Sequence, residues 1–334
     1  MAPKVYVTDG VFPSLDIERE VLASVGAELA LVQCKTEEDV ARYCHDADGL
    51  LVVYTPIGAK ALAGLPNCRV VVRMGIGYDP LDLSACTEFR VCAVNVPDYC
   101  VPEVSDHALA LILTCARRIA KLDRAVRAGK WSAAQTVPTM QRLGEQVLGI
   151  VGFGRIGREL GRKARALGLT VLAYDPYVGA ETLAAYGAQR ATLAELLARS
   201  DYVSINCLLN AETYHLIGEA ELRQMKRGAY LVNTSRGPVV DEAALIQALR
   251  EGLITGAALD VLETEPLAAD SPLLSMENVV LTPHAAYYSE RAYKELHRRS
   301  AQEVARVLSG HYPHSLLNPE VKERLRALGR ELAD

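Results

Sequence analysis

The chain repeats one pattern of apolar and polar positions almost from end to end. Short apolar runs of strand length alternate with longer segments in which apolar residues recur every three or four positions, as on one face of a helix. In the first part of the chain we predict strands at Lys4–Thr8, Glu28–Val32, Gly49–Val53, Arg69–Val72 and Val91–Val94. Helical periodicity between these strands is clearest over Ser14–Val25 and Glu37–Cys44.

A second series of the same kind follows. Its predicted strands are Val147–Val151, Thr170–Tyr174, Tyr202–Asn206, Ala229–Val232 and Gly256–Asp260, and its predicted helices include Arg155–Leu167, Leu193–Ala198 and Asp241–Arg250. Regular alternation of strands and helices is typical of a parallel sheet covered by helices on both faces. The two series therefore predict an α/β protein with two doubly wound parallel-sheet domains.

The two series are separated by a long helical pattern rather than by a flexible linker. Apolar residues recur at helical spacing from Pro102 to Arg127, Pro102 suits a first helical turn, and Gly129 follows as a stop signal. The last polar stretch, Pro319–Leu332, is also helix-prone, but the sequence indicates no packing partner for it.

Composition excludes several functional classes. A chain of 334 residues has room for about two domains. Its net charge of −5 gives no basic field for nucleic acid or an anionic membrane surface. Charged residues interrupt every long apolar run, so we expect no membrane-spanning helix. The first residues do not have the pattern of an export signal, and we expect a cytoplasmic protein.

Cysteine and histidine spacing does not predict a metal site. The eight cysteines contain no Cys-x-x-Cys pair, and the seven histidines form no cluster at ligand spacing. In a reducing compartment such cysteines are expected to be buried apolar thiols. We therefore predict no metal.

A dinucleotide signature opens the second series. Gly152, Gly154 and Gly157 form Gly-x-Gly-x-x-Gly directly after an apolar strand and at the start of an amphipathic helix. The three glycines allow a tight turn, close approach of a pyrophosphate, and close helix–strand packing, in that order. The helix N-terminus then offers free N–H groups to the phosphates.

The acidic residue that completes this signature is Asp175, at the end of the next predicted strand. Its carboxylate would accept hydrogen bonds from the adenosine ribose and repel the 2′-phosphate of NADP. No arginine or lysine follows until Arg190. The predicted cofactor is NAD.

Three titratable or charged residues lie at or just beyond the ends of later strands, where ligands bind in open α/β sheets. The guanidinium of Arg236 can hold a carboxylate through two parallel bonds. His284 can exchange a proton with a hydroxyl group, and Glu265 can fix its tautomer. Taken singly, each residue also suits a structural role as an ion-pair partner, a cap or a loop histidine.

Several motifs in order resemble the D-2-hydroxyacid dehydrogenase family, which includes phosphoglycerate dehydrogenase, formate dehydrogenase and the C-terminal-binding-protein (CtBP) corepressors. They are Val147–Gly157, Asn233-Thr-Ser-Arg-Gly237, Leu259-Asp-Val-Leu-Glu-Thr-Glu-Pro266 and Thr282-Pro-His-Ala-Ala286, and the likeness covers roughly residues 1–315. The resemblance implies that Arg236 anchors the substrate, His284 is the acid/base and Glu265 its partner.

The resemblance also implies a domain organisation. A Rossmann NAD-binding domain would span residues 99–286, and a discontinuous, flavodoxin-like substrate domain would combine residues 1–98 with residues 287–334. The long helix of residues 102–127 would lie at a homodimer interface, and the active site would lie in a cleft that closes by hinge motion.

Within the family, four stretches resemble the CtBP-like branch: Arg73-Met-Gly-Ile-Gly77-Tyr-Asp79, Tyr174-Asp-Pro-Tyr177, Cys207-Leu-Leu-Asn210 and His284-Ala-Ala-Tyr-Tyr-Ser-Glu290. This likeness implies a substrate pocket formed by Tyr54, Arg73, Gly75, Ile76, Gly77 and Tyr287. It implies further cofactor contacts at Val104, Arg155, Ile156, Cys207, Asn210, Thr213, Thr234, Ser235 and Asp260, the last beside the nicotinamide amide.

The leading hypothesis is an NAD-dependent enzyme that interconverts a D-2-hydroxy acid and its 2-keto acid, with a small molecule as substrate. One alternative is an NADH-sensing scaffold that binds peptides, as the corepressors do. Another is a dehydrogenase for phosphite or a phosphonate, because Arg73 and Arg236 together would suit a dianion.

Overall fold

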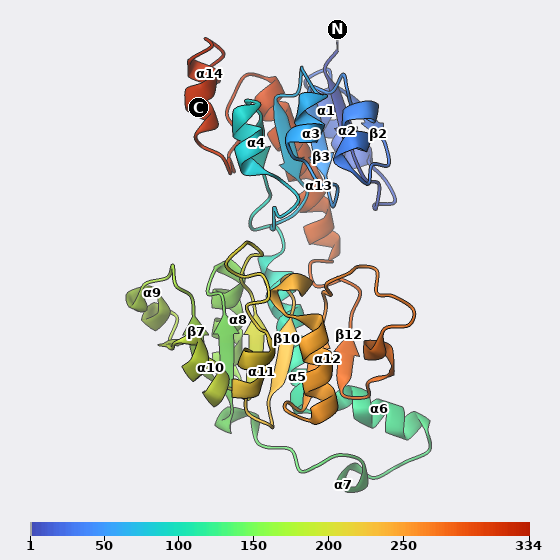
Figure 1. Ribbon diagram of the computed structural model, residues 1–334, viewed down its shortest axis with the longest axis vertical. Helices are drawn as coiled ribbons and strands as arrows, with labels where there is room; N and C mark the ends of the chain where they lie inside the picture. Colours follow the sequence, from blue (N-terminus) through green and yellow to red (C-terminus); the bar gives the residue numbers. More distant parts are fainter. Residues whose placement is uncertain (1) are drawn as a thin grey trace. The chain divides into compact units, whose positions relative to one another are not determined.

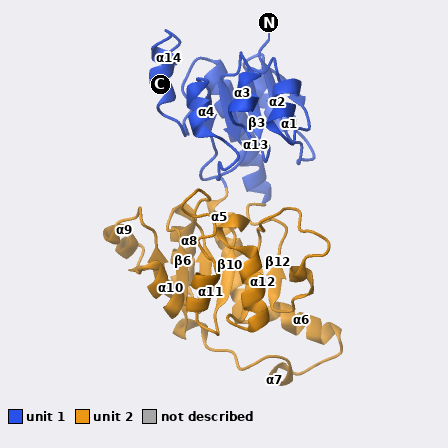
Figure 2. Cartoon of the chain, in the orientation of Figure 1, with its two compact units in different colours: residues 1–99, 289–334 blue, residues 100–288 orange. Residues whose placement is uncertain are grey.

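The two series of strands form two separate parallel sheets in the computed structural model, which describes residues 2–334 (Figure 1). Each sheet belongs to one of two compact units (Figure 2). Unit 1 combines the chain up to Tyr99 with Ser289–Asp334, and unit 2 is Cys100–Tyr288. Both units have helices packed on the sheets, so the predicted fold class is confirmed.

Among the described residues, unit 1 contains a five-stranded sheet in the order β2–β1–β3–β4–β5, which is the flavodoxin-like order. Its strands are β1 (Lys4–Val7), β2 (Glu28–Leu31), β3 (Gly49–Val52), β4 (Val70–Arg73) and β5 (Cys92–Val94). Its helices are α1 (Asp16–Ala23), α2 (Glu37–Tyr43), α3 (Ala59–Ala63), α4 (Leu83–Glu88), α13 (Glu290–Leu308) and α14 (Val321–Arg326).

The C-terminal segment completes unit 1. Helix α13 packs against α1, β3 and β4, and the buried side chains of Glu18 and His297 form a hydrogen bond between α1 and α13. Asn318 fastens the tail to β5, because its side chain accepts from the Ala93 N–H at 2.9 Å and donates to the Val91 carbonyl at 3.0 Å. The tail therefore packs beside β5.

Unit 2, all of which is described, contains a seven-stranded sheet in the order β12–β11–β10–β9–β6–β7–β8. Its strands are β6 (Val147–Val151), β7 (Thr170–Tyr174), β8 (Gln189–Arg190), β9 (Tyr202–Ile205), β10 (Tyr230–Asn233), β11 (Gly256–Leu259) and β12 (Val279–Leu281). The order reverses between β6 and β9, which is the point where such sheets bind dinucleotides at their carboxyl ends.

The helices of unit 2 are α5 (Val101–Ala116), α6 (Ile119–Arg127), α7 (Ala133–Thr136), α8 (Arg155–Ala166), α9 (Ala180–Ala185), α10 (Leu193–Arg199), α11 (Glu219–Gln224) and α12 (Glu242–Glu251). Three 3₁₀ turns are η1 (Leu143–Glu145), η2 (Gly237–Val239) and η3 (Pro272–Ser275). One core joins α10, α11 and α12 to one face of the sheet, and another joins α5 and α8 to the opposite face. Alternate strand residues such as Leu148 and Val151 supply the two cores, as the pleat of a strand requires.

The predicted helix from residue 102 to residue 127 is two helices. Arg118 has a left-handed backbone (φ 55°), which ends α5 and begins α6 in a new direction. The guanidinium of Arg118 lies 4.7 Å from the centre of the Tyr230 ring. Helical spacing on both sides of the break predicted one helix because a single left-handed arginine has no sequence signature.

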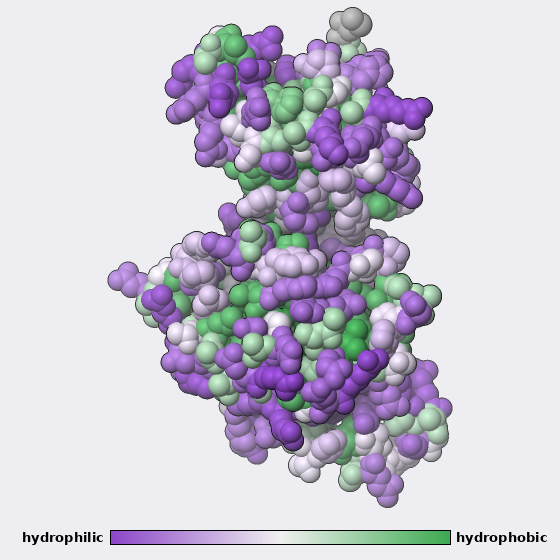
Figure 3. Space-filling model, viewed as in Figure 1, coloured by the Kyte–Doolittle hydropathy of each residue, from purple (hydrophilic) through white to green (hydrophobic). Residues whose placement is uncertain are grey.

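The visible surface is mostly polar, and most of the cysteine thiols are buried. Polar residues predominate on the face that Figure 3 shows, with smaller apolar areas between them. All eight cysteines are among the described residues and are free thiols, and all but Cys207 are buried. Burial raises the pKa of the thiols of Cys68 and Cys115 to about 12. Within residues 2–334, no helix has both the length and the apolar character needed to cross a membrane.

Candidate active site

The glycine-rich turn after β6 has three distinct packing environments. A Cβ on Gly152 would lie 2.5 Å from the Cys207 backbone nitrogen, and Gly152 also has a positive φ of 90°. A Cβ on Gly157 would lie 2.3 Å from the Gly152 carbonyl oxygen, so helix α8 approaches the turn closely. At Gly154 no described atom beyond the two adjacent residues lies within 4 Å of such a Cβ. The turn therefore leaves open space at the glycine that would face a pyrophosphate.

Asp175 follows β7 and is bound to this turn. One carboxylate oxygen accepts a hydrogen bond from the Phe153 N–H at 2.8 Å, and the other accepts one from the Tyr177 N–H at 2.9 Å. The carboxylate thus has a fixed position beside the glycine-rich turn. This is the arrangement that ribose recognition needs.

Two buried polar atoms at the carboxyl ends of neighbouring strands lack hydrogen-bond partners within residues 2–334. They are the Oγ1 atom of Thr234, after β10, and the Oδ1 atom of Asn206, after β9. Thr234 is 8% exposed. Buried polar atoms are nearly always hydrogen-bonded in folded proteins, so these two point to a bound polar group. Together with the open space at Gly154, the residues present fit a dinucleotide.

Three predicted cofactor residues follow β9, namely Cys207, Asn210 and Thr213. Their loop is held by hydrogen bonds within itself. The side-chain oxygen of Asn210 accepts from the Thr213 N–H at 3.1 Å, and the Thr213 hydroxyl donates to the Leu208 carbonyl at 2.6 Å. Burial raises the pKa of Cys207 to about 11. Arg155 and Ile156 lie in the first turn of α8, and Val104 is buried in the first turn of α5.

His284 and Glu265 form a direct pair. The Nδ1 atom of His284 lies 2.7 Å from Oε2 of Glu265, and Oε1 of Glu265 accepts from the Leu262 N–H at 3.0 Å. Burial by itself raises the pKa of Glu265, but the hydrogen bond and charge of His284 outweigh it, helped by the Leu262 N–H and the charge of Arg236. The net effect lowers the pKa of Glu265, so the carboxylate stays ionised.

Asp260 fixes the loop that carries His284. Its buried carboxylate accepts hydrogen bonds from the Ala285 N–H and the Ala286 N–H, both at 2.9 Å, and from the Thr282 hydroxyl at 2.5 Å. The His284 N–H also donates to the Asp260 carbonyl at 2.8 Å, which holds His284 at a positive φ of 51°. Asp260, predicted beside the nicotinamide, is here bonded to the loop that carries His284.

The sequence interpretation missed His107. Its Nε2 atom lies 3.0 Å from the Thr282 hydroxyl and 3.4 Å from the Asp260 carboxylate, so α5 also braces the His284 loop. A histidine that faces an acid across a long sequence separation leaves no motif, so only the structure could place His107. On the same loop, the ring of Tyr287 lies edge-on to His284, with centroids 6.3 Å apart.

Arg236 lies in a turn fixed by its neighbours. The Asn233 side chain donates to the Arg236 carbonyl at 2.9 Å, and the Arg236 N–H donates to the Ser235 hydroxyl at 2.6 Å. A Cβ on Gly237 would lie 1.9 Å from the Leu262 carbonyl carbon. The turn of Arg236 therefore packs on the backbone that leads to Glu265, and the structure brings all three predicted catalytic residues to one edge of unit 2.

The remaining predicted substrate residues lie in unit 1. Arg73 ends β4, is 7% exposed, and packs its guanidinium against Gly75. The Asn95 side chain donates to the Ile76 carbonyl at 2.6 Å, which fixes the loop that ends at Gly77. These residues occupy the carboxyl edge of the unit 1 sheet.

Tyr54 is positioned by an acid that the sequence interpretation did not single out. The carboxylate of Asp9, after β1, accepts hydrogen bonds from the backbone N–H groups of Val53, Tyr54 and Thr55, with 2.9 Å for Val53 and 3.1 Å for Thr55. The signal available in the sequence was an aspartate directly after a predicted strand.

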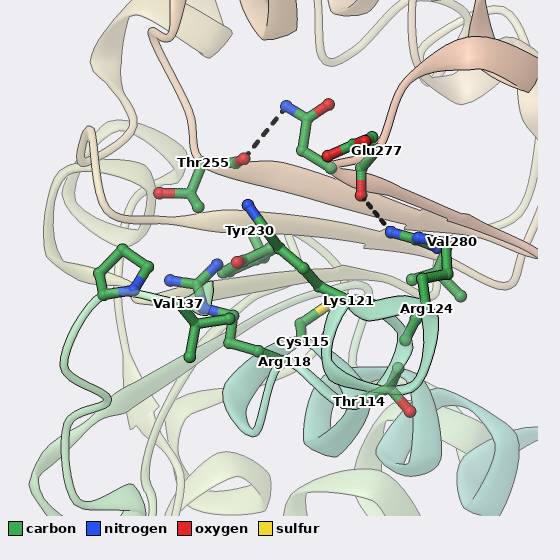
Figure 4. A pocket seen from close by; sticks show the side chains of 13 residues that line it. Thr114, Cys115, Arg118, Lys121, Arg124, Val137, Tyr230, Thr255, Glu277 and Val280 are labelled. Atoms are coloured by element: carbon green, nitrogen blue, oxygen red, sulfur yellow. Dashed lines mark hydrogen bonds between the residues drawn. The ribbon is translucent and has the colours of Figure 1, made fainter. Parts of the chain in front are cut away.

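A cavity of about 280 Å³ in unit 2 is separate from these residues (Figure 4). Arg118, Lys121, Arg124, Tyr230 and Glu277 are among the residues that line it. Tyr230 begins β10, and Arg124 donates to the Glu277 carbonyl at 2.6 Å. The cavity thus lies at the amino ends of the strands, whereas Arg236, Glu265 and His284 follow carboxyl ends.

Comparisons with known proteins agree on one family. Residues 109–286 match the sequence profile of the NAD-binding domain of D-isomer-specific 2-hydroxyacid dehydrogenases. The chain is 39% identical over 331 residues to a glyoxylate reductase of Korarchaeum cryptofilum, covering 96% of this chain and 97% of that protein. It is 37% identical to a glyoxylate reductase of Thermofilum pendens, covering 96% and 95%.

Solved structures give the same picture. A glyoxylate reductase from Paecilomyes thermophila superposes with a TM-score of 0.85 at 28% identity, covering 96% of this chain and 99% of that one. A D-lactate dehydrogenase from Aquifex aeolicus, complexed with NAD and lactic acid, gives 0.83 at 29% identity, covering 92% and 96%.

Proposed function

Because the chain belongs to the D-isomer-specific 2-hydroxyacid dehydrogenase family and is NAD-dependent, we propose that it reduces a small 2-keto acid to the D-2-hydroxy acid, and the reverse. Glyoxylate is the first substrate to test, since two relatives that share most of the chain bear the name glyoxylate reductase. The observation that supports this most strongly is the 2.7 Å pair of His284 and Glu265 on a loop packed against the turn of Arg236.

In the proposed reaction Arg236 binds the substrate carboxylate through two parallel charge-assisted hydrogen bonds. When bound, the reduced nicotinamide supplies a hydride to the carbonyl carbon. The Nε2 atom of protonated His284 gives its proton to the carbonyl oxygen, so hydride and proton together form the alcohol. Glu265 accepts the Nδ1–H bond and keeps the ring oriented, so that Nε2 faces the substrate oxygen.

We assign cofactor binding to the edge where β6 and β9 diverge. The glycine-rich turn would receive the pyrophosphate, Asp175 the ribose hydroxyls, and Thr234 a polar group of the dinucleotide. Arg155, Ile156, Val104, Cys207, Asn210, Thr213, Ser235 and Asp260 remain proposed cofactor residues.

For the substrate we propose Arg73 and the loop of Gly75, Ile76 and Gly77, together with Tyr54 and Tyr287. A compact keto acid such as glyoxylate has one carboxylate and one carbonyl oxygen. Arg236 and His284 account for both, and Arg73 with the loop of Gly75 to Gly77 remain further proposed substrate residues.

We further propose a homodimer formed through helix α6. No residue of this helix is buried among the described residues, although its apolar residues share one face, and the nearby Trp131 is 87% exposed. Exposed apolar groups of this kind mark contact surfaces. A second copy of the chain would cover them.

The test is consumption of NADH with a panel of 2-keto acids, with phosphite and NAD measured in parallel. We expect turnover with glyoxylate or another small keto acid, and a loss of at least about 100-fold in kcat/KM in Arg236→Gln, because a bidentate bond to the carboxylate is lost. Arg223→Gln, which removes surface ion pairs with Glu219 and Glu251, is the matched control. NADH binding without turnover on any keto acid would contradict the proposal.

A further inference from the structure

His215 lies outside every residue assigned above, in the turn between the loop of Thr213 and helix α11. Its backbone is left-handed (φ 50°), which is uncommon for a residue other than glycine. Such a conformation persists only where the surroundings hold it. The contacts of His215 show what holds it.

Its backbone is tied to the turn that carries Arg236. The His215 N–H donates to the Pro238 carbonyl at 2.8 Å, and Ile217 pairs with the same segment through its N–H to the Val239 carbonyl at 3.1 Å. Pro238 is the second residue after Arg236. His215 is therefore fixed to the Arg236 turn by main-chain bonds that do not depend on its side chain.

Its side chain is tied to the loop that carries Glu265. The Nε2 atom of His215 lies 2.5 Å from Oε1 of Glu263, and the ring stacks on Tyr214 with centroids 4.1 Å apart. Glu263 precedes Glu265 by two residues, and its neighbour Leu262 supplies the N–H that binds the Glu265 carboxylate. Movement of Glu263 would therefore move the group that orients Glu265.

The charges around the ring make this bond important. Two carboxylates lie beside it, since Glu263 contacts Nε2 and Asp241 lies 3.8 Å from Nδ1. Glu242 accepts a hydrogen bond from the Glu263 N–H at 3.2 Å. His215 supplies the only donor side chain that the structure records for the Glu263 carboxylate within the described residues. Without the imidazole, the Glu263 carboxylate would lie near the Asp241 carboxylate with no side-chain donor between them, and would turn toward solvent.

We propose that His215 is a positioning residue that sets the spacing between Arg236 and the Glu265–His284 pair. Its main chain holds the Arg236 turn, and its ring holds the Glu265 loop through Glu263. The inference rests on the proposed function, because it concerns the geometry of that reaction. A misplacement of about 1 Å at a reacting group can cost about 100-fold in rate.

The experiment compares His215→Ala, His215→Gln and Glu263→Ala with the wild type, and Glu219→Gln serves as a surface control on the neighbouring helix. For each we would measure kcat and KM for the best keto acid, the Kd of NADH by fluorescence, and Tm. We expect His215→Ala to lower kcat/KM about 10- to 100-fold, with a lower kcat and a higher KM for the keto acid. NADH affinity should change less than about threefold. In His215→Gln the amide donor should restore most of the loss.

A double variant separates positioning from general destabilisation. Because both side chains act through one bond, His215→Ala with Glu263→Ala should be no slower than either single variant. Additive losses, or a fall in kcat that follows the folded fraction with KM unchanged, would overturn the positioning role. Wild-type kinetics in His215→Ala would overturn it while leaving the proposed function intact. A wild type inactive on every keto acid would instead reject the proposed function, and the inference with it.

Discussion

Single side chains in unit 2 are arranged so that the proposed acid/base has little freedom. The backbone N–H of His284 donates to the Asp260 carbonyl, and its Nδ1 atom pairs with Glu265. His107 bonds to Thr282 at the start of the same loop. The carboxylate of Asp260 receives two backbone N–H bonds and one hydroxyl bond, so its own position is fixed as well. A rigid supporting shell of this kind is what proton transfer at a defined atom requires.

The ionisation of Glu265 should make the stability of unit 2 depend on pH. Its pKa is lower in the folded protein than its ordinary value of 4.5, so the ionised carboxylate stabilises unit 2 above about pH 4.5. That contribution is lost as the pH falls through the lowered folded pKa. Glu265→Gln lacks this titration, so the Tm difference between wild type and variant should hold from pH 6 to pH 5 and shrink below pH 4.5. Thermal unfolding across this range checks it, and a difference that grows in acid would contradict it.

Residues with a motif were predictable, and residues without one were not. Gly152, Asp175 and His284 are each set by a local pattern after a strand, which the sequence displays directly. Asp9 and His215 act through hydrogen bonds to segments distant in the chain. Such bonds depend on which strand ends become neighbours, and periodicity alone does not determine that.

At the scale of elements, the predicted strands lie within one or two residues of the observed ones. The signal is strongest for β3, β4, β9, β10 and β11, which are buried along their whole length, as expected of central strands in a parallel sheet. The break at Arg118 and the docking of the tail through Asn318 were not predictable, since one depends on a single left-handed residue and the other on side-chain bonds to β5. The glycine-rich turn before α8 is the element whose function can be tested most cleanly.

Two alanine substitutions in that turn should separate folding from cofactor binding. In Gly157→Ala the new Cβ would meet the Gly152 carbonyl at 2.3 Å, so we expect a lower Tm as well as lost NADH affinity. In Gly154→Ala the Cβ enters open space, so Tm should stay within about 2 °C of wild type. NADH affinity should nevertheless fall at least about tenfold, because the methyl group occupies the space assigned to the pyrophosphate. Tight NADH binding by Gly154→Ala would show that the cofactor lies elsewhere.

At the scale of the whole molecule, the two units are each complete doubly wound folds, and the chain passes between them near Tyr99 and again near Ser289. The residues assigned to the cofactor and to proton transfer lie in unit 2, whereas Tyr54, Arg73 and the Gly75–Gly77 loop lie in unit 1. The dimer proposed through α6 would involve unit 2 alone.

The dimer can be tested through Trp131. A glutamate in place of an 87% exposed tryptophan leaves no cavity within a single chain, so Trp131→Glu should fold normally. If a second copy covers this side chain, burying the charge would weaken association strongly. Light scattering coupled to size exclusion should give a dimer for wild type and a shift toward monomer for the variant. A wild-type monomer at micromolar concentration would refute the interface.

In the proposed reaction His284 transfers the proton while the nicotinamide supplies the hydride. The most direct test is a single-turnover measurement in which enzyme loaded with NADH is mixed with glyoxylate or the best keto acid, for wild type and His284→Asn. Asparagine keeps a polar group near the position of Nδ1 and cannot act as an acid at neutral pH. We predict hydride transfer slower by about 100- to 10,000-fold with NADH binding retained. A near-wild-type rate in His284→Asn would contradict the assignment.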